Sequence, residues 1–408
     1  MPYPSPLRLV VVGNGMAGLK LVEELEPRSH HVTVIGSEPE PAYNRVLLSS
    51  VLAGETTLDD IRLRGRDWYA ERGVTLLTGD PVTAVRPARH EVVLKSGARV
   101  GYDRLVLATG SEAIRLPLPG AGLKGVRTFR DMADVALLQA VPAGTPAVVI
   151  GGGLLGIEAA YGLVRRGLDV TLLHLMPHLM ERQLDPVASG LLRRALEARG
   201  IRVLLEADTA AIEAGPGLPG HQGHAEAVVL RNGRRLPAQL VVMAVGVRPS
   251  TALASTGGID IGRGIKVDDK LETNWPGVYA LGECAEHRGQ WYGLVEPAYD
   301  QARVLARYLG GQPARYEGSL VATSLKVSGV PLYSIGDIEG RGAEAIVLED
   351  AATGVYRKLV VRDGRLVGAV LYGDTADALW YRELVQRRSR IDALRPALPF
   401  GRAFAEAA

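Results

Sequence analysis

Two short glycine-rich turns have the spacing that most clearly points to chemistry. The first reads GNGMAG from Gly13 to Gly18, and the second reads GGGLLG from Gly151 to Gly156. In such a turn the first glycine permits a tight bend, the second lets backbone N–H groups approach a pyrophosphate, and the third lets a helix pack closely on a strand. The amino end of the helix adds a favourable dipole. Each turn therefore predicts that a dinucleotide is bound by backbone amides rather than by charged side chains.

Both turns lie where a strand pattern gives way to a helix pattern. The apolar run LRLVVV comes directly before Gly13, the helical GLKLVEEL follows the turn, and HVTVIG supplies the next strand. Around the second turn, Ala147–Ile150 predicts a strand, Gly156–Arg165 a helix and Val170–Leu173 the following strand. The two units start 138 residues apart (151 − 13), which is about the size of a domain. The sequence therefore predicts two Rossmann-like domains.

The residue that reads the adenosine ribose in such units is normally an acid at the end of the second strand, roughly 20 residues after the first glycine. An offset of 23 residues from Gly13 reaches Gly36 (36 − 13), and Glu38 two residues later is the candidate. The same offset from Gly151 reaches His174 (174 − 151), which is neither the carboxylate that excludes a 2′-phosphate nor the arginine that accepts one. The choice between NADH and NADPH stays open, with NADH slightly favoured.

The composition describes a soluble globular protein rather than a nucleic-acid-binding one. The chain has 408 residues and a formal net charge of +2, so no strong basic excess is available for a phosphate backbone. Its length implies roughly two to four domains. No apolar run approaches the roughly 20 residues that a bilayer helix needs. The start MPYPSPLRLVVVG lacks a signal-peptide pattern, so we expect a cytoplasmic protein.

Metal and thiol chemistry find little support in the sequence. Cys284 is the single cysteine, which excludes an internal disulfide, a dithiol pair and a multi-cysteine metal site. Redox chemistry must therefore use a bound cofactor. His221 and His224 fall in the Pro/Gly-rich stretch AGPGLPGHQGH, where we expect solvated loop residues rather than metal ligands. We predict no metal site.

The domain division follows from changes in the strand pattern. The runs RLVLATG and QLVVMAVG end at Gly110 and Gly246, where a doubly wound sheet places strands that border the ligand crevice. After about Ser319 the chain changes to short strands followed by the helical ALWYRELVQRR. We predict an α/β protein with a discontinuous first domain over residues 1–114 and 241–318, a second domain over 115–240 and a carboxyl-terminal α+β domain over 319–408.

Further motifs resemble those of a known flavoprotein family. LVLATGS, from Leu105 to Ser111, resembles the motif that joins FAD and NAD domains, and TNWPGVYALGECAEH, from Thr273 to His287, resembles the second FAD motif. In that second motif, Glu283 stands where most relatives have an aspartate that contacts the flavin ribitol. Together with the glycine turns, these motifs resemble the pyridine nucleotide-disulfide oxidoreductase fold over nearly the whole chain.

Within that fold, the chain is similar to the FAD-containing amino-terminal half of NAD(P)H-dependent assimilatory nitrite reductase large subunits. The similar segments are AYNRVLLSSVLAGE, GGGLLGIEAAYGL, HLMPHLMERQLD, GECAEHRGQWYGLVEP and SLKVSGVPLYSIGD. Full-length members continue into a cysteine-rich iron–sulfur segment and a sirohaem domain. This sequence stops at FGRAFAEAA, about where that segment would begin. We therefore expect its electrons to leave for another carrier.

The resemblance implies FAD and NAD(P)H as cofactors and assigns residues to each. Glu158 would face the nicotinamide and the flavin, and Arg45 would lie near the flavin or its phosphates. Ser50 stands where ferredoxin-reductase relatives hold a lysine at the flavin. The set implied for FAD is Gly13, Gly15, Met16, Ala17, Gly18, Glu38, Asn44, Arg45, Val82, Ala108, Thr109, Gly110, Gly282, Glu283, Glu296 and Pro297. The set implied for NAD(P)H is Gly151, Gly153, Leu154, Leu155, Gly156, Glu158, His174, Val245 and Gly246.

The implied activity is an NAD(P)H oxidoreductase that passes a hydride to FAD and then electrons to a protein acceptor. The acceptor would be a nitrite reductase catalytic subunit, a ferredoxin or a rubredoxin, and a homodimer stays open. A thiol or peroxide reductase of the same fold is a second hypothesis. Such enzymes place a reactive cysteine near residues 42–48, where this chain has none, and Cys284 is expected to be a packed thiol. A non-enzymatic nucleotide sensor or scaffold is the third hypothesis.

Overall fold

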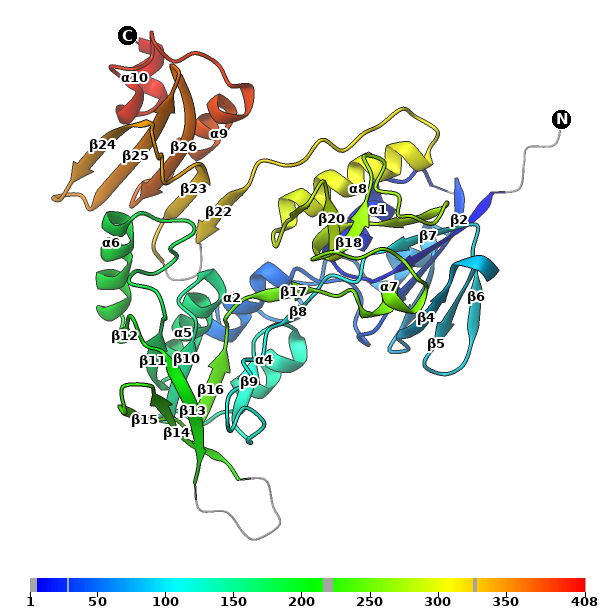
Figure 1. The fold of residues 1–408 in the computed structure, drawn as a ribbon, viewed down its shortest axis with the longest axis horizontal. Helices are drawn as coiled ribbons and strands as arrows, with labels where there is room; N and C mark the ends of the chain where they lie inside the picture. The colour runs from blue at the N-terminus through cyan, green and yellow to red at the C-terminus, as the bar shows by residue number, and fades with distance from the viewer. Residues whose placement is uncertain (1–5, 28, 216–222, 326–328, 408) are drawn as a thin grey trace. The chain divides into compact units, whose positions relative to one another are not determined.

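The computed structural model describes residues 6–27, 29–215, 223–325 and 329–407. These residues fall into two compact units. The first unit combines the described residues of Met1–Leu48, Thr57–Glu112 and Val247–Ser319, and the second combines those of Ser49–Thr56, Ala113–Gly246 and Leu320–Ala408. Each unit is therefore built from segments that are far apart in the sequence (Figure 1).

A parallel five-stranded sheet forms the centre of the first unit. Its central strands β1 (Leu7–Val12) and β7 (Arg104–Leu107) carry buried apolar runs, as expected where both faces of a parallel sheet are covered. Helices α1 (Met16–Glu24) and α8 (Val295–Leu309) pack against each other beside the sheet. The strand order is β19 (Val278–Ala280), β7 (Arg104–Leu107), β1 (Leu7–Val12), β2 (His30–Gly36) and β3 (Thr75–Thr78).

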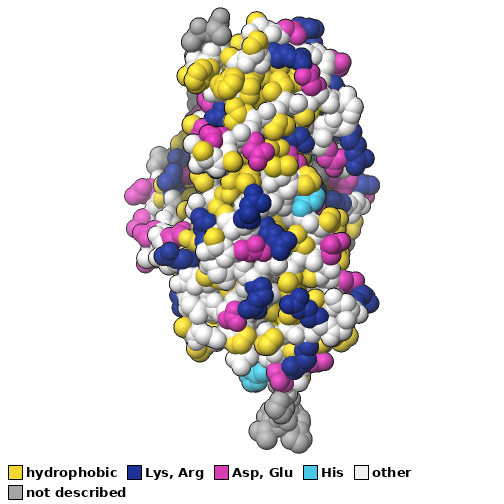
Figure 2. Space-filling view, turned by 90° about the vertical axis from the view of Figure 1, so that its left-hand side faces the viewer, with side chains coloured by type: hydrophobic (Ala, Val, Ile, Leu, Met, Phe, Trp, Pro, Cys, Tyr) yellow, Lys and Arg dark blue, Asp and Glu magenta, His cyan; other side chains and the backbone are white. Residues whose placement is uncertain are grey.

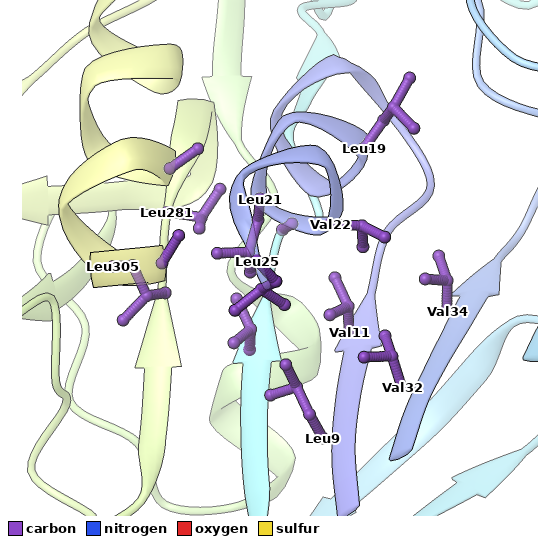
Figure 3. Packing of buried hydrophobic residues seen from close by; sticks show 14 of the residues in the cluster. Leu9, Val11, Leu19, Leu21, Val22, Leu25, Val32, Val34, Leu281 and Leu305 are labelled. Carbon is purple, nitrogen blue, oxygen red and sulfur yellow. The ribbon is translucent and has the colours of Figure 1, made fainter. Parts of the chain in front are cut away.

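Apolar side chains of α1 hold this helix on the sheet. In Figure 3, Leu21, Val22 and Leu25 of α1 lie over Leu9 and Val11 of β1, and all five are buried. Burial of one such side chain contributes about 1.5–3 kcal/mol. This packing fixes the start of α1, and with it the glycine turn that joins β1 to the helix.

The second unit contains another parallel five-stranded sheet with the same succession of strand, glycine turn and helix. The helix after the turn is α5 (Leu154–Arg165), and α4 (Met132–Gln139) and α6 (Pro186–Glu197) belong to the same unit. The strand order is β12 (Arg202–Leu204), β11 (Asp169–Leu173), β10 (Pro146–Ile150), β16 (Leu240–Met243) and β9 (Val126–Thr128). The two sheets confirm the α/β class with two Rossmann-like domains.

Strand β16 marks a difference from the division predicted from the sequence. That division returns the chain to the first domain at residue 241, yet Val241 to Met243 pair with Val148 to Ile150 of β10 in the second sheet. All four residues of β16 are buried, because the strand lies between β10 and β9. The chain returns to the first unit only at Val247. Helix α5 likewise begins at Leu154, two residues before the predicted start.

Residues after Ser319 form an antiparallel five-stranded sheet with helix α9 (Ala378–Arg387) on one face. Tyr381 and Val385 of α9 pack on Leu359 and Leu371 of the sheet. The strand order is β22 (Ala322–Leu325), β23 (Leu332–Gly336), β26 (Arg365–Tyr372), β25 (Val355–Arg362) and β24 (Glu344–Asp350). This arrangement confirms the predicted carboxyl-terminal α+β fold.

The opposite face of this sheet packs on the start of α6. The Tyr356 hydroxyl donates a hydrogen bond to Asp185 Oδ2 at 2.6 Å, and Lys358 Nζ lies 3.6 Å from the same oxygen. Asp185 Oδ1 also accepts a hydrogen bond from the Ala188 N–H at 2.9 Å, which caps α6. One carboxylate therefore joins the carboxyl-terminal sheet to the rest of the second unit.

The remaining strands form small sheets, and the remaining helices are short. The strands are β4 (Val82–Arg86), β5 (Glu91–Leu94), β6 (Arg99–Gly101), β8 (Ser111–Ala113), β13 (Thr209–Ala214), β14 (Ala225–Leu230), β15 (Arg235–Pro237), β17 (Val247–Pro249), β18 (Ile265–Val267), β20 (Ala285–His287) and β21 (Gln290–Trp291). The helices are α2 (Leu48–Ala53), α3 (Arg66–Glu71), α7 (Ala252–Thr256) and α10 (Arg402–Ala407), with 3-10 turns η1 (Arg45–Leu47), η2 (Pro87–Arg89), η3 (Gly282–Cys284) and η4 (Leu398–Phe400).

Two properties of the exterior bear on partners. Over the described ranges, no helix has both the length and the apolar content that crossing a lipid bilayer requires. On the face shown in Figure 2, Lys and Arg side chains are intermixed with Asp and Glu, in keeping with the net charge of +2. This face therefore offers no tract of a single charge sign.

Candidate dinucleotide-binding sites

The first glycine turn joins β1 to α1, and its three glycines meet three different demands. Gly13 has φ +118°, and a Cβ there would overlap the carbonyl oxygen of Ala108, which follows β7. A Cβ on Gly18 would overlap the Gly13 carbonyl oxygen, so this glycine lets the helix pack against the strand. A Cβ on Gly15 would meet nothing within 4 Å. Of the three glycines, only Gly15 has open space beside its Cα. The second glycine of a pyrophosphate-binding turn needs this space so that the ligand can approach the backbone.

The second turn, between β10 and α5, repeats this geometry. Gly151 has φ +122°, and a Cβ there would overlap the carbonyl oxygen of Ala244, which follows β16. A Cβ on Gly156 would overlap the Gly151 carbonyl oxygen, and a Cβ on Gly153 would meet nothing within 4 Å. Each turn is thus set against the neighbouring strand of its own sheet, so the sequence repeat corresponds to a structural one.

The first backbone N–H groups of α1 and α5 have no side-chain cap. Gly15 and Gly153 are the N-cap residues, with extended backbones at φ −90°, ψ −170° and φ −82°, ψ −178°. A glycine cannot supply a capping oxygen, so the N–H groups of each first turn need another acceptor. The helix dipole favours an anion at this end. A dinucleotide pyrophosphate fits both positions, and Met16, Ala17, Leu154 and Leu155 provide the first amides.

Asn14 adds an independent sign of a ligand at the first turn. Its Oδ1 accepts a hydrogen bond from the Tyr69 hydroxyl at 2.8 Å, whereas its buried Nδ2 has no hydrogen-bond partner among the described residues. A buried donor without an acceptor is costly, so Nδ2 suits a ligand oxygen. The sequence analysis missed Asn14, although a polar residue inside GNGMAG was an available signal.

The segment that resembles the second FAD motif reaches the first turn. A Cβ on Gly282, which has φ +82°, would lie 2.9 Å from the Ala17 Cβ. The Gly282 N–H donates to Oε1 of the buried Gln301 on α8 at 2.7 Å. Glu283 Oε2 accepts a hydrogen bond from Ser111 Oγ at 2.7 Å. Gly282 therefore lies beside the start of α1, and hydrogen bonds with Gln301 and Ser111 hold the segment that contains it. Gln301 is a residue that the sequence analysis missed.

Glu38 and Arg45, which the sequence assigns to separate contacts, are partners of each other. Arg45 Nη2 donates to Glu38 Oε1, and the Tyr43 hydroxyl donates to Glu38 Oε2 at 2.7 Å. The Arg45 guanidinium lies 4.9 Å from the centre of the Tyr43 ring. Asn44 accepts a hydrogen bond from the Val46 N–H at 3.1 Å and so begins η1. Glu38 and Arg45 therefore form an ion pair with each other. The cofactor contacts that the sequence assigns to these residues stay predictions.

The other residues assigned to the cofactors lie at the ends and starts of elements in the expected unit. Thr109 Oγ1 donates to the Ser250 carbonyl oxygen at 2.9 Å, and the Gly246 carbonyl oxygen accepts from the Ile114 N–H at 3.0 Å. The residues in the first unit are Ala108, Thr109 and Gly110 after β7, Val82 in β4, and Glu296 and Pro297 in α8; Val245 and Gly246 follow β16 in the second unit.

Glu158 lies in the second turn of α5 and is 7% exposed. Burial raises the pKa of its carboxyl to about 7, and a hydrogen bond with Ser49 opposes this shift. A carboxyl with this pKa can hold or release a proton near neutral pH, as a general acid or base requires. Ser49 is itself buried. The sequence analysis singled out the neighbouring Ser50 and not Ser49. No local pattern pairs Ser49 with Glu158.

His174 follows β11 at the predicted ribose position, but its ring is held by the protein. Nδ1 accepts a hydrogen bond from the Gly152 N–H at 3.0 Å, and Nε2 lies 3.0 Å from Glu181 Oε2. Because Nδ1 accepts, the proton sits on Nε2, which donates to Glu181. Both ring nitrogens are engaged, so the ring has none left for a ribose hydroxyl.

Cys284 is a packed thiol. It is fully buried, its Sγ donates to the Leu281 carbonyl oxygen at 3.2 Å, and burial raises its pKa. A buried neutral thiol is a poor nucleophile. Within the described part of the chain, no three His, Cys, Asp or Glu side chains gather as metal ligands. His221 lies outside the described residues, and His224 directly precedes β14.

Two cradles built from strand, glycine turn and uncapped helix define the class of a two-dinucleotide oxidoreductase. The model of the family described as pyridine nucleotide-disulphide oxidoreductase matches residues 7–302. The chain belongs to this family. Residues 322–389 match the rubredoxin NAD+ reductase C-terminal domain.

Comparisons with individual proteins narrow the class. The chain is 44% identical over 401 residues to an NAD(P)H nitrite reductase of Bacillus subtilis (strain 168), covering 95% of this chain and 49% of the relative. It is 43% identical over 376 residues to an assimilatory nitrate reductase electron transfer subunit of the same strain, covering 91% and 48%. It also resembles the crystal structure of the covalent putidaredoxin reductase–putidaredoxin complex, with a TM-score of 0.87, 26% identity and coverage of 99% of both chains.

The chain spans about half the length of each of these two Bacillus subtilis relatives. Within that half, these similarities identify an NAD(P)H-dependent oxidoreductase whose cofactors are FAD and NAD(P)H. The cradles, the uncapped helix ends and the Asn14 donor fit these cofactors.

Proposed function

We propose that this chain is the electron-input part of a nitrite reductase system, which takes a hydride from NAD(P)H onto FAD and passes electrons to a protein acceptor. One relative is named a nitrite reductase and another an assimilatory nitrate reductase electron transfer subunit, and each matches more than nine-tenths of this chain. The observation that carries the proposal is the repeated cradle around Gly15 and Gly153. We place the protein in the cytoplasm, because NAD(P)H is its reductant.

In this proposal the chain supplies binding, orientation and a proton site. FAD, when bound, provides the capacity to accept a hydride and to release electrons singly. The amides after Gly15 and Gly153 bind the two pyrophosphates, which restricts the positions of the attached rings. Glu158 exchanges a proton near neutral pH, and Ser49 orients its carboxyl group.

A second candidate acceptor is a small ferredoxin or rubredoxin. The likeness to the putidaredoxin reductase complex covers almost the whole chain, and residues 322–389 match a rubredoxin reductase domain. A thiol or peroxide substrate is disfavoured, because Cys284 is buried and residues 42–48 contain no cysteine. A homodimer is a further prediction, which sedimentation of the purified protein tests.

The first experiment mixes the flavin-loaded protein with NADH or NADPH in the absence of oxygen. We expect the flavin absorbance to bleach with at least one nucleotide. The reduced protein is then mixed with a sirohaem nitrite reductase catalytic subunit, a ferredoxin or a rubredoxin, and the carrier that restores the flavin absorbance fastest is the acceptor. Flavin that neither nucleotide bleaches would refute the proposal.

The second experiment uses a matched pair of glycine variants. Gly153 and Gly65 are both helix N-caps with extended backbones, and an added Cβ meets nothing within 4 Å at either position. Gly65 begins α3 and belongs to neither cradle. Gly153→Ala should slow flavin reduction at low NADH by about tenfold or more, because the methyl group displaces the pyrophosphate. Gly65→Ala should leave this rate unchanged, and equal slowing by both variants would contradict the assigned cradle.

A further inference from the structure

The end of β11 lacks the acid that normally forms hydrogen bonds with the adenosine ribose. The loop that follows β11 places the carboxylate of Glu181 next to His174 at this position. Glu181 Oε2 lies 3.0 Å from Nε2 of His174, and the Glu181 side chain is 29% exposed. Its Oε1 has no hydrogen-bond partner among the described residues. Glu181 Oε1 is therefore available to a ligand. It belongs to a side chain that is hydrogen-bonded to His174, the residue at the usual position of the acid.

The loop that carries Glu181 is held against the second glycine turn. The Met180 N–H donates to the Gly152 carbonyl oxygen at 3.0 Å, and a Cβ on Gly152 would lie 2.6 Å from both His174 Cγ and Leu179 Cδ2. Met180 has φ +50°, a left-handed conformation that other residues than glycine adopt only where their surroundings impose it. Turn, histidine and loop therefore form one packed assembly that fixes the backbone before Glu181.

We propose that Glu181, positioned by His174, accepts hydrogen bonds from the ribose hydroxyls of NADH and repels the 2′-phosphate of NADPH. The inference rests on the proposed function, because it assigns a reader to the same nucleotide site. His174 is a positioning residue, since it joins the Gly152 N–H to the Glu181 carboxylate. The chain thus replaces the acid at the strand end by a histidine and an acid seven residues later (181 − 174).

Equilibrium binding of NAD⁺ and NADP⁺ to the oxidised, flavin-loaded protein measures this preference without turnover. We expect NAD⁺ to bind more tightly to the native protein. Glu181→Gln should reduce the preference about tenfold, because it keeps the side-chain size and removes the charge that repels the phosphate. His174→Gln should also reduce the preference for NAD⁺ over NADP⁺, while the flavin spectrum stays unchanged. The control Glu197→Gln removes an α6 carboxylate that pairs with Arg193, and should change neither affinity.

The alternative outcomes are distinguishable. A purely structural role of Glu181 would weaken both nucleotides by one factor and leave their ratio unchanged, which would overturn the inference. The exposed Arg182 is the competing reader. If the native protein preferred NADP⁺ and Arg182→Gln abolished that preference, the inference would be overturned, and Arg182 would be the residue that selects the nucleotide. If the native protein bound neither nucleotide, the proposed function itself would fail.

Discussion

The buried carboxyl of Glu158 should contribute to the pH dependence of the stability of this protein, and Glu158→Gln should remove that contribution. Burial raises its pKa from 4.5 to about 7. The pKa rises by about 2.5 (7 − 4.5), which corresponds to roughly 3 to 4 kcal/mol at about 1.4 kcal/mol per pH unit. This is a substantial part of the stability of an ordinary domain.

The sign follows from which state binds the proton. Below pH 4.5 the carboxyl is protonated in both the folded and the unfolded chain, so it has no cost. As the pH rises to 7, the unfolded chain releases the proton while the folded chain retains it, and the free energy of unfolding falls. The full loss of roughly 3 to 4 kcal/mol is reached above pH 7. Glutamine does not titrate and retains a polar group for Ser49.

The assay is urea unfolding of the native protein and of Glu158→Gln, at one FAD concentration, followed by tryptophan fluorescence. From pH 5 to pH 8, the free energy of unfolding of the variant should rise by about 2 to 3 kcal/mol relative to that of the native protein. Other titrating groups are common to both proteins and cancel in the difference. A difference that stays constant over this range would show that Glu158 is charged at neutral pH, and the reasoning from burial would be wrong.

Four further substitutions test the first cradle, the contact between the carboxyl-terminal sheet and α6, and the thiol. Gly15→Ala should fold but lose FAD, whereas Gly13→Ala should disrupt the sheet because its Cβ overlaps backbone; flavin absorbance and circular dichroism separate the two results. Asp185→Ala should lower the free energy of unfolding by about 3 kcal/mol in urea, because it removes a helix cap and leaves the largely buried Lys358 without its ion partner. Cys284→Ala should leave flavin reduction by NADH unchanged, and a thiol reagent should label Cys284 only after unfolding.

The glycine turns could be predicted because their demands are local. Within six residues, Gly13 permits the bend, Gly15 leaves room for a ligand to approach the backbone, and Gly18 lets the helix pack on the strand. The neighbouring apolar runs identify the strand and the helix. The same holds for the second turn. Sequence reasoning therefore found both cradles and the fold class that they imply.

Pairings between distant residues could not be predicted in this way. Ser49 and Glu158 are 109 residues apart (158 − 49), and only the folded chain brings them together. The run LVVM of β16 suits a buried strand of either sheet, so its pairing with β10 was needed to decide the domain boundary. At His174 the sequence could not reveal the contact with Glu181, because that carboxylate comes from the following loop and meets the ring only in the folded chain.

The two cradles have the same backbone shape, so the turns alone cannot tell a resident cofactor from a visiting one. The difference lies in the residue between the first two glycines, which is Asn14 in one turn and Gly152 in the other. The buried side-chain amide of Asn14 has no hydrogen-bond partner among the described residues, whereas the Gly152 N–H donates to His174. The first turn therefore has a side-chain donor that the second turn lacks, although the glycine geometry of the two turns is the same.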